Sequence, residues 1–135
     1  MLDHNEIAQR VLEVAPDDIS LIVLFGSRAR GDHSEHSDLD IAVSTTEKDR
    51  EKRFNLRLQI ISELEGPALA VDVVLIEDAN WALRYRIARD GVVLSQKDDD
   101  SWSDFIEEVL IHYPDYRIFE QRLLKETLGG IQTGT

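Results

Sequence analysis

The sequence predicts an α/β fold, in which crossover helices flank a sheet and a helical extension follows at the C-terminus. Three observations predict it. Short segments with strand character occur at residues 21–25, 38–43 and 68–76. Longer segments with helical periodicity lie before, between and after them, which is typical of α/β proteins. The chain has 135 residues, enough for one domain with a buried core.

The first elements are a helix and two strands. Apolar residues between Ile7 and Val14 recur at helical spacing, and Pro16 ends this helix. Residues 21–25 are all apolar and mostly of high β-propensity, which predicts a buried strand. Residues 38–43 alternate polar and apolar side chains, so one side of this strand faces the core and the other faces away from it.

Two helices are expected in the middle of the chain. Residues 47–65 predict a charged helix that ends at Gly66 and Pro67. Residues 79–89 predict another helix, which Gly91 ends before a short apolar run. The apolar stripe expected on the first of these helices consists of Phe54, Leu58, Ile61 and Leu64.

The C-terminal part of the chain predicts two helices at about residues 101–128, separated near Pro114. Each has an apolar stripe, which either covers the sheet or meets a partner; packing on the sheet is the favoured interpretation. Since no linker or repeat interrupts the sequence, we expect a single domain over residues 1–135 with its core at about residues 19–95.

A Gly-Ser pair follows the first apolar run and suggests a phosphate-binding turn. Gly26 allows a sharp turn and close approach of a ligand to the backbone. Ser27 lies at the start of a short helix or turn, where free N–H groups and a hydroxyl can bind anionic oxygens. Arg28 and Arg30 add guanidinium groups, which suit phosphate by charge and by geometry.

Two carboxylates share one side of the next strand. Because side chains alternate along a strand, Asp38 and Asp40 face the same way, roughly 7 Å apart. Carboxylates placed in this way repel each other unless a cation lies between them, and Mg²⁺ prefers such oxygen ligands. A third carboxylate, Asp72, is the one polar residue of the run 68–76, where a charge needs a partner. If the two strands are neighbours, the three carboxylates surround one or two metal ions.

Each of these features also has a simpler interpretation. A Gly-Ser pair after a strand is most often only a turn, and Asp-x-Asp is often a solvated strand edge. Asp72 could pair with an arginine such as Arg84 or Arg86. The order and spacing of all the features together favour a nucleotide and metal site.

These motifs resemble a known superfamily. Gly-Ser, followed ten residues later by Asp-x-Asp and then by a lone Asp in a later strand, is similar to nucleotidyltransferases of the DNA polymerase β type. The string from Gly26 to Gly31, with Ser-Asp-Leu-Asp after it, most resembles the minimal nucleotidyltransferase antitoxins paired with HEPN-domain toxins. The resemblance covers residues 19–76 well and continues weakly through residues 89–94. It implies a mixed, palm-like sheet flanked by helices.

The resemblance also implies a chemistry and a partner. Gly26 and Ser27 would bind ATP phosphates, and Asp38 and Asp40 would bind Mg²⁺. Asp72 would complete a site of two metal ions and help to activate the attacking hydroxyl. The implied activity is transfer of AMP to a tyrosine of the HEPN toxin. Two alternatives remain: a nucleotidyltransferase that modifies small molecules such as aminoglycosides, and a protein that neutralises a toxin by binding alone.

Composition excludes several other classes of protein. The chain has no cysteine, so disulfide frameworks, thiol nucleophiles and zinc–thiolate sites are excluded. No apolar stretch approaches the length of a membrane span, and the first residues lack the pattern of a signal peptide, so a cytoplasmic location is expected. The net charge of −12 argues against binding of long nucleic acids and suits a basic protein partner, although many soluble domains are acidic. His33 and His36 could contact substrate, but solvated loop positions are the favoured interpretation.

Overall fold

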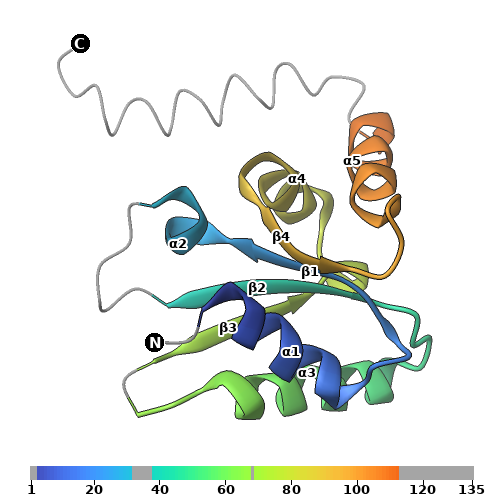
Figure 1. The fold of residues 1–135 in the computed structure, drawn as a ribbon. Helices are drawn as coiled ribbons and strands as arrows, with labels where there is room; N and C mark the ends of the chain where they lie inside the picture. Colours follow the sequence, from blue (N-terminus) through green and yellow to red (C-terminus); the bar gives the residue numbers. More distant parts are fainter. Residues whose placement is uncertain (1–2, 32–37, 68, 113–135) are drawn as a thin grey trace, which may run out of the picture.

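The computed structural model describes residues 3–31, 38–67 and 69–112. In this part of the chain, four strands form one mixed sheet in the order β3-β2-β1-β4 (Figure 1). The strands are β1 (Ile19–Phe25), β2 (Leu39–Thr45), β3 (Val71–Leu75) and β4 (Val92–Gln96). Strand β1 is antiparallel to both β2 and β4, whereas β2 and β3 are parallel. The predicted α/β fold with a mixed sheet is confirmed.

Helices cover both faces of the sheet. Helices α1 (His4–Val14) and α3 (Arg50–Leu64) pack on one face, and α4 (Trp81–Asp90) and α5 (Ser101–His112) pack on the other (Figure 1). A five-residue helix, α2 (Gly26–Arg30), follows β1 directly, and a 3₁₀ turn, η1 (Ile76–Asp78), follows β3. Helix α5 therefore covers the sheet, as the favoured interpretation of its stripe expected. The second C-terminal helix that the sequence suggests lies outside the described residues.

Strand β2 divides its side chains between the two faces. Leu39, Ile41 and Val43 are buried in the core under α1 and α3. Ala42 belongs to the second core, under α4 and α5. Since successive side chains alternate, Asp40 lies on the α4–α5 side of the sheet. The hydrophobic pattern of the strand thus determines which face carries the carboxylate.

The apolar stripe of α3 differs from the prediction. Leu56, Ile60 and Leu64 are buried, whereas Phe54 is 56% exposed and Leu58 is 45% exposed. The helix is apolar on two adjacent sides, so periodicity alone cannot decide which side packs. Two arginines of the same helix bond residues on or after β3. Arg53 bonds the Asp78 carboxylate, and Arg57 bonds the Val73 carbonyl.

Side-chain caps fix where the longer helices begin. Asp3, Asp49 and Asn80 each accept a hydrogen bond from a backbone N–H three residues further on, at 2.8, 3.0 and 2.8 Å. None of the helices in the described part of the chain has both the length and the apolar character needed to cross a membrane.

Candidate active site

The predicted phosphate turn is the junction between β1 and α2. Gly26 has a φ of +74°, a conformation that favours glycine. A Cβ atom at this position would also overlap the Asp40 carboxylate, since it would lie only 3.0 Å from the Asp40 Cγ atom. The predicted phosphate turn and β2 therefore touch, and a side chain at position 26 would disturb the contact. Gly31, at φ +79°, ends α2 by donating its N–H to the Ser27 carbonyl.

The three predicted metal-binding residues come from two adjacent parallel strands. Asp40 and Asp72 are direct register partners across β2 and β3, and Asp40 is also paired with Phe25 at the end of β1. Asp38 lies just before β2 and is exposed. The expected adjacency of the two strands is thus confirmed. Neighbouring strands are about 4.8 Å apart, so the carboxylate-bearing backbones meet at one end of the sheet.

The carboxylates act on one another electrostatically. Burial raises the pKa of Asp40 above its ordinary value, and the charges of Asp72 and Asp38 raise it further. The positive charges of Arg30 and Arg28 oppose this effect and lower the pKa. Ionised Asp40 is therefore destabilised in the ligand-free protein, which is the condition in which a cation between the carboxylates is most favourable.

In the ligand-free structure Asp72 faces an arginine. The Arg57 Nη2 atom is 3.7 Å from the Asp72 Oδ1 atom, and the Arg57 Nε–H donates a 2.6 Å hydrogen bond to the Val73 carbonyl. The Asp72 side chain is 54% exposed, because β3 is an edge strand. The simpler interpretation, that Asp72 pairs with an arginine, is therefore confirmed in kind. The partner is Arg57 and not Arg84, whose guanidinium bonds the Ile76 and Glu77 carbonyls.

The strands bring the predicted metal-binding residues to one end of the sheet, but their side chains do not form a closed cluster. In the described part of the chain, no group of three or more His, Cys, Asp or Glu side chains lies close enough together to hold a metal ion. The residues nevertheless fit Mg²⁺. Asp40 and Asp72 are in register, Asp38 is two residues away on the same strand side, and their charges repel. Carboxylate oxygens that repel in this way are the ligands that Mg²⁺ prefers.

Sequence reasoning missed two charged residues next to the site. Arg57 approaches Asp72 from α3, which packs on the opposite face of the sheet. Asp90, the last residue of α4, has an Oδ2 atom 3.8 Å from the Arg30 Nη1 atom. No local pattern in the sequence signals either contact, because both depend on how helices pack. His33 and His36 lie outside the described residues.

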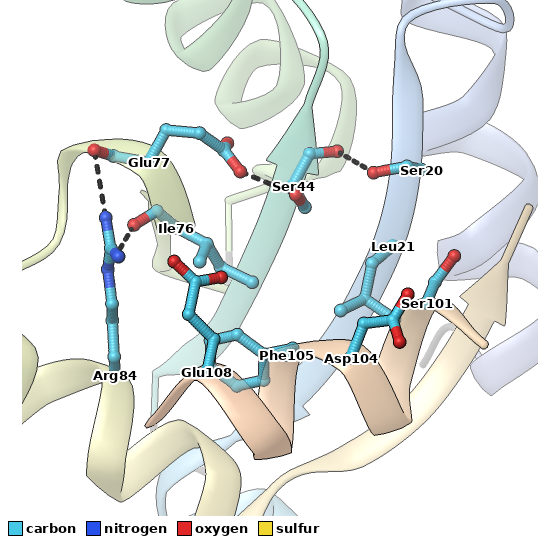
Figure 2. Close-up of a pocket in the computed structure, with 10 residues that line it drawn as sticks. All are labelled: Ser20, Leu21, Ser44, Ile76, Glu77, Arg84, Ser101, Asp104, Phe105 and Glu108. Carbon is cyan, nitrogen blue, oxygen red and sulfur yellow. Dashed lines mark hydrogen bonds between the residues drawn. The ribbon is translucent and has the colours of Figure 1, made fainter. Parts of the chain in front are cut away.

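A polar cavity of about 430 Å³ lies apart from the carboxylates, between β1, β2, η1, α4 and α5 (Figure 2). Its polar lining comprises Ser20, Ser44, Glu77, Arg84, Ser101, Asp104 and Glu108. The Glu77 carboxylate accepts hydrogen bonds from the Ser44 hydroxyl at 2.5 Å and from the Thr45 N–H at 2.9 Å. Ser44 is roughly 13 Å along the strand from Asp40. The cavity contains none of the predicted site residues, so it is separate from the candidate active site.

Comparison with known proteins identifies the class. The family described as "Polymerase beta, Nucleotidyltransferase" matches residues 6–100, which is more than half of the chain. The chain therefore belongs to the polymerase β nucleotidyltransferase family. This family membership implies an enzyme with a nucleotide substrate. The predicted resemblance is confirmed at this level.

More particular similarities point to one branch of the family. The chain is 28% identical, over 95% of its length and 90% of the relative's, to the protein adenylyltransferase MntA of Aphanizomenon flos-aquae. It is 31% identical to the protein adenylyltransferase MntA of Shewanella oneidensis, over 73% of this chain and 70% of the relative. Its fold matches a chain in a mutant MntA–HpeT toxin–antitoxin complex, with a TM-score of 0.67 and 26% identity, over 95% of this chain and 99% of that one. The expected similarity to minimal nucleotidyltransferase antitoxins is thus confirmed.

Proposed function

We propose that this protein is an antitoxin that transfers AMP from ATP to a tyrosine hydroxyl of a partner HEPN toxin and thereby neutralises it. One observation carries the proposal. Asp40 is in register with Asp72 and in contact range of Gly26, so phosphate turn and carboxylates meet at one end of the sheet. The named activity of the MntA relatives supports the choice of a protein as acceptor.

The donor half of the site consists of the turn and the first two carboxylates. Gly26 and Ser27 would bind the outer phosphates of ATP, and Arg28 and Arg30 would add positive charge. Asp38 and Asp40 would hold one Mg²⁺ ion, and Asp72 would share a second. When bound, these ions would supply charge neutralisation on the phosphates and a lower pKa for the acceptor hydroxyl.

The acceptor half is centred on Asp72. A free tyrosine has a pKa near 10, so its hydroxyl is a poor nucleophile at neutral pH. Asp72 lies on the edge strand with more than half of its side chain exposed, where another protein could bring a tyrosine. The tyrosine oxygen would then form a bond to the α-phosphorus, the bond to the β-phosphate would break, and pyrophosphate would leave in line. Positioning and charge stabilisation would supply most of the acceleration.

The structure offers little support for a small-molecule acceptor. An aminoglycoside is a polycation, and the acidic side chains that line the cavity of about 430 Å³ could bind such a cation. The cavity begins roughly 13 Å along β2 from Asp40, however, which is too far for direct transfer. The other alternative is a protein that neutralises the toxin by binding alone. An experiment must distinguish it from an enzyme that transfers AMP.

The test uses a purified HEPN-domain toxin, labelled ATP and Mg²⁺. Label should appear on the toxin, and mass spectrometry of peptides should place AMP on a tyrosine. The double variant Asp38→Ala, Asp40→Ala should fold but transfer nothing, because both side chains point away from the apolar half of β2. Transfer by the folded double variant would refute the metal assignment. Neutralisation of the toxin without any transfer by the wild type would show a binding protein instead.

A further inference from the structure

The Asp90 carboxylate lies between two arginines at the C-terminal end of α4. The Arg89 Nε–H and Nη2–H donate hydrogen bonds of 2.8 and 2.6 Å to its two oxygens. The Arg30 Nη1 atom approaches the Asp90 Oδ2 atom from α2, at 3.8 Å. This contact links the segment 89–94, to which the sequence assigns no chemistry, to the predicted phosphate turn.

Asp90 is a costly residue at this position. A negative charge at a helix C-terminus is opposed by the helix dipole. Its side chain is also only 15% exposed, which further disfavours the charge. The two arginines compensate for both effects. A carboxylate that local structure opposes, and that two cations satisfy, indicates a role beyond the helix itself.

The end of α4 is fixed in place. Gly91 donates its N–H to the Ile87 carbonyl at 2.8 Å and closes the helix. A Cβ atom at Gly91 would overlap that carbonyl and would lie 2.5 Å from the Val23 Cγ1 atom of β1. The backbone therefore packs directly on the central sheet at this point. Asp90, one residue earlier, is thus a rigid anchor for any side chain that it binds.

Arg30, by contrast, has a long side chain that is 42% exposed. It is the last residue of α2, the short helix that begins at the predicted phosphate turn. Arg89 makes the two short hydrogen bonds to Asp90, whereas Arg30 approaches the same carboxylate at the longer distance of 3.8 Å. The Asp90 carboxylate thus lies where it can orient the Arg30 guanidinium.

We propose that Asp90 is a positioning residue that orients Arg30 for the phosphates of the bound nucleoside triphosphate. The proposal rests on the proposed function, since it takes ATP with Mg²⁺ as the ligand. Ordering a flexible arginine before the ligand arrives lowers the entropy lost on binding. The effect requires the Asp90 carboxylate but no contact between Asp90 and the nucleotide.

The sign of one measurement distinguishes positioning from simple charge. Asp90→Asn removes a negative charge near an anion-binding site, which by electrostatics alone would tighten binding of a triphosphate. Loss of positioning would weaken binding instead. We expect weakening of about two- to fivefold, the range that an exposed ion pair supports. The measurement is calorimetric titration of a non-hydrolysable ATP analogue in the presence of Mg²⁺.

A double-mutant cycle with Arg30→Ala tests whether Asp90 acts through Arg30. In the Arg30→Ala background, Asp90→Asn should no longer weaken binding. In transfer assays, Asp90→Asn should raise KM for ATP and leave kcat unchanged, and Asp90→Glu should restore part of the affinity. Tighter binding by Asp90→Asn, or equal weakening in both backgrounds, would overturn the proposal.

Asp78→Asn is the matched control. It breaks another Arg–Asp pair, in which Asp78 accepts hydrogen bonds of 3.3 and 2.8 Å from Arg53. Asp78 belongs to η1, which follows the end of β3 that is remote from Asp72, and Arg53 belongs to α3, so analogue affinity should not change. If Asp90→Asn does not fold, Asp90→Ala with and without Arg30→Ala gives the same cycle. If the wild type binds no ATP analogue, the proposed function is overturned as well. If the wild type binds the analogue and Asp90→Asn binds it with the same affinity, only the role of Asp90 is overturned.

Discussion

Replacing Gly26 with alanine tests whether the phosphate turn and the carboxylates form one site. An alanine at φ +74° is strained by about 1–2 kcal/mol. The added Cβ would also overlap the Asp40 carboxylate, so Asp40 must rotate away from its position beside Asp72. Crowding of this kind adds about 1–3 kcal/mol. We expect the free energy of unfolding to fall by about 2–4 kcal/mol and binding of the Mg²⁺–ATP analogue to be largely lost.

Gly31 provides a control with nearly the same backbone. Its φ is +79°, but a Cβ there would meet no atom within 4 Å. Gly31→Ala should therefore lose only about 1–2 kcal/mol of stability and keep its affinity for the analogue. Urea unfolding and calorimetric titration of both variants give the comparison. Equal losses of stability and of affinity in the two variants would refute the idea that contact with Asp40 is what requires glycine at position 26.

Two further substitutions act on the carboxylates. Asp40→Asn should stabilise the ligand-free protein at neutral pH, because burial and two neighbouring charges raise the pKa of Asp40 in the folded state. The folded protein then binds this proton more tightly than the unfolded chain, so the wild type loses stability as pH rises from the ordinary value of 3.8 through the raised pKa. Urea unfolding should show this pH-dependent loss of stability in the wild type only. A difference in the free energy of unfolding between the two proteins that does not change with pH would contradict the raised pKa. Asp72→Asn should keep analogue affinity within about a factor of ten but nearly abolish transfer to the toxin. A parallel loss of affinity and transfer would instead assign Asp72 to the donor side.

The sequence determines the central part of the site because local rules suffice there. The apolar half of β2 must face a core, and this requirement sends Asp40 to the opposite face. The apolar run that contains Asp72 predicts a strand, and a right-handed crossover through α3 makes that strand a parallel neighbour of β2. A glycine directly after β1 then brings the turn next to the carboxylate. The first and last steps use only residue type and alternation, and the second also uses the connection rule for consecutive parallel strands.

The surrounding charges could not be predicted, because they depend on the packing of helices. Helix α3 has apolar residues on two sides, and periodicity chose Phe54 and Leu58 where the structure buries Leu56 and Ile60. Arg57 reaches Asp72 only because of the side that is actually buried. Likewise, the apolar character of the run around Asp72 does not reveal that β3 forms an edge of the sheet.

The charges around the site favour joint binding of a metal ion and a nucleotide over binding of either one alone. Three carboxylates occupy its centre, and arginines lie at its margins: Arg30 beside Asp90, and Arg57 beside Asp72. A triphosphate alone would bring more negative charge to the carboxylates, whose repulsion already raises the pKa of Asp40. A divalent cation alone would compete with Arg57 for Asp72. When both bind, the carboxylates would hold the cation, the cation would offset the charge of the phosphates, and the arginines would add further positive charge. On the proposed function, the donor therefore enters the site as a nucleotide–metal complex, and each component removes the repulsion that opposes the other.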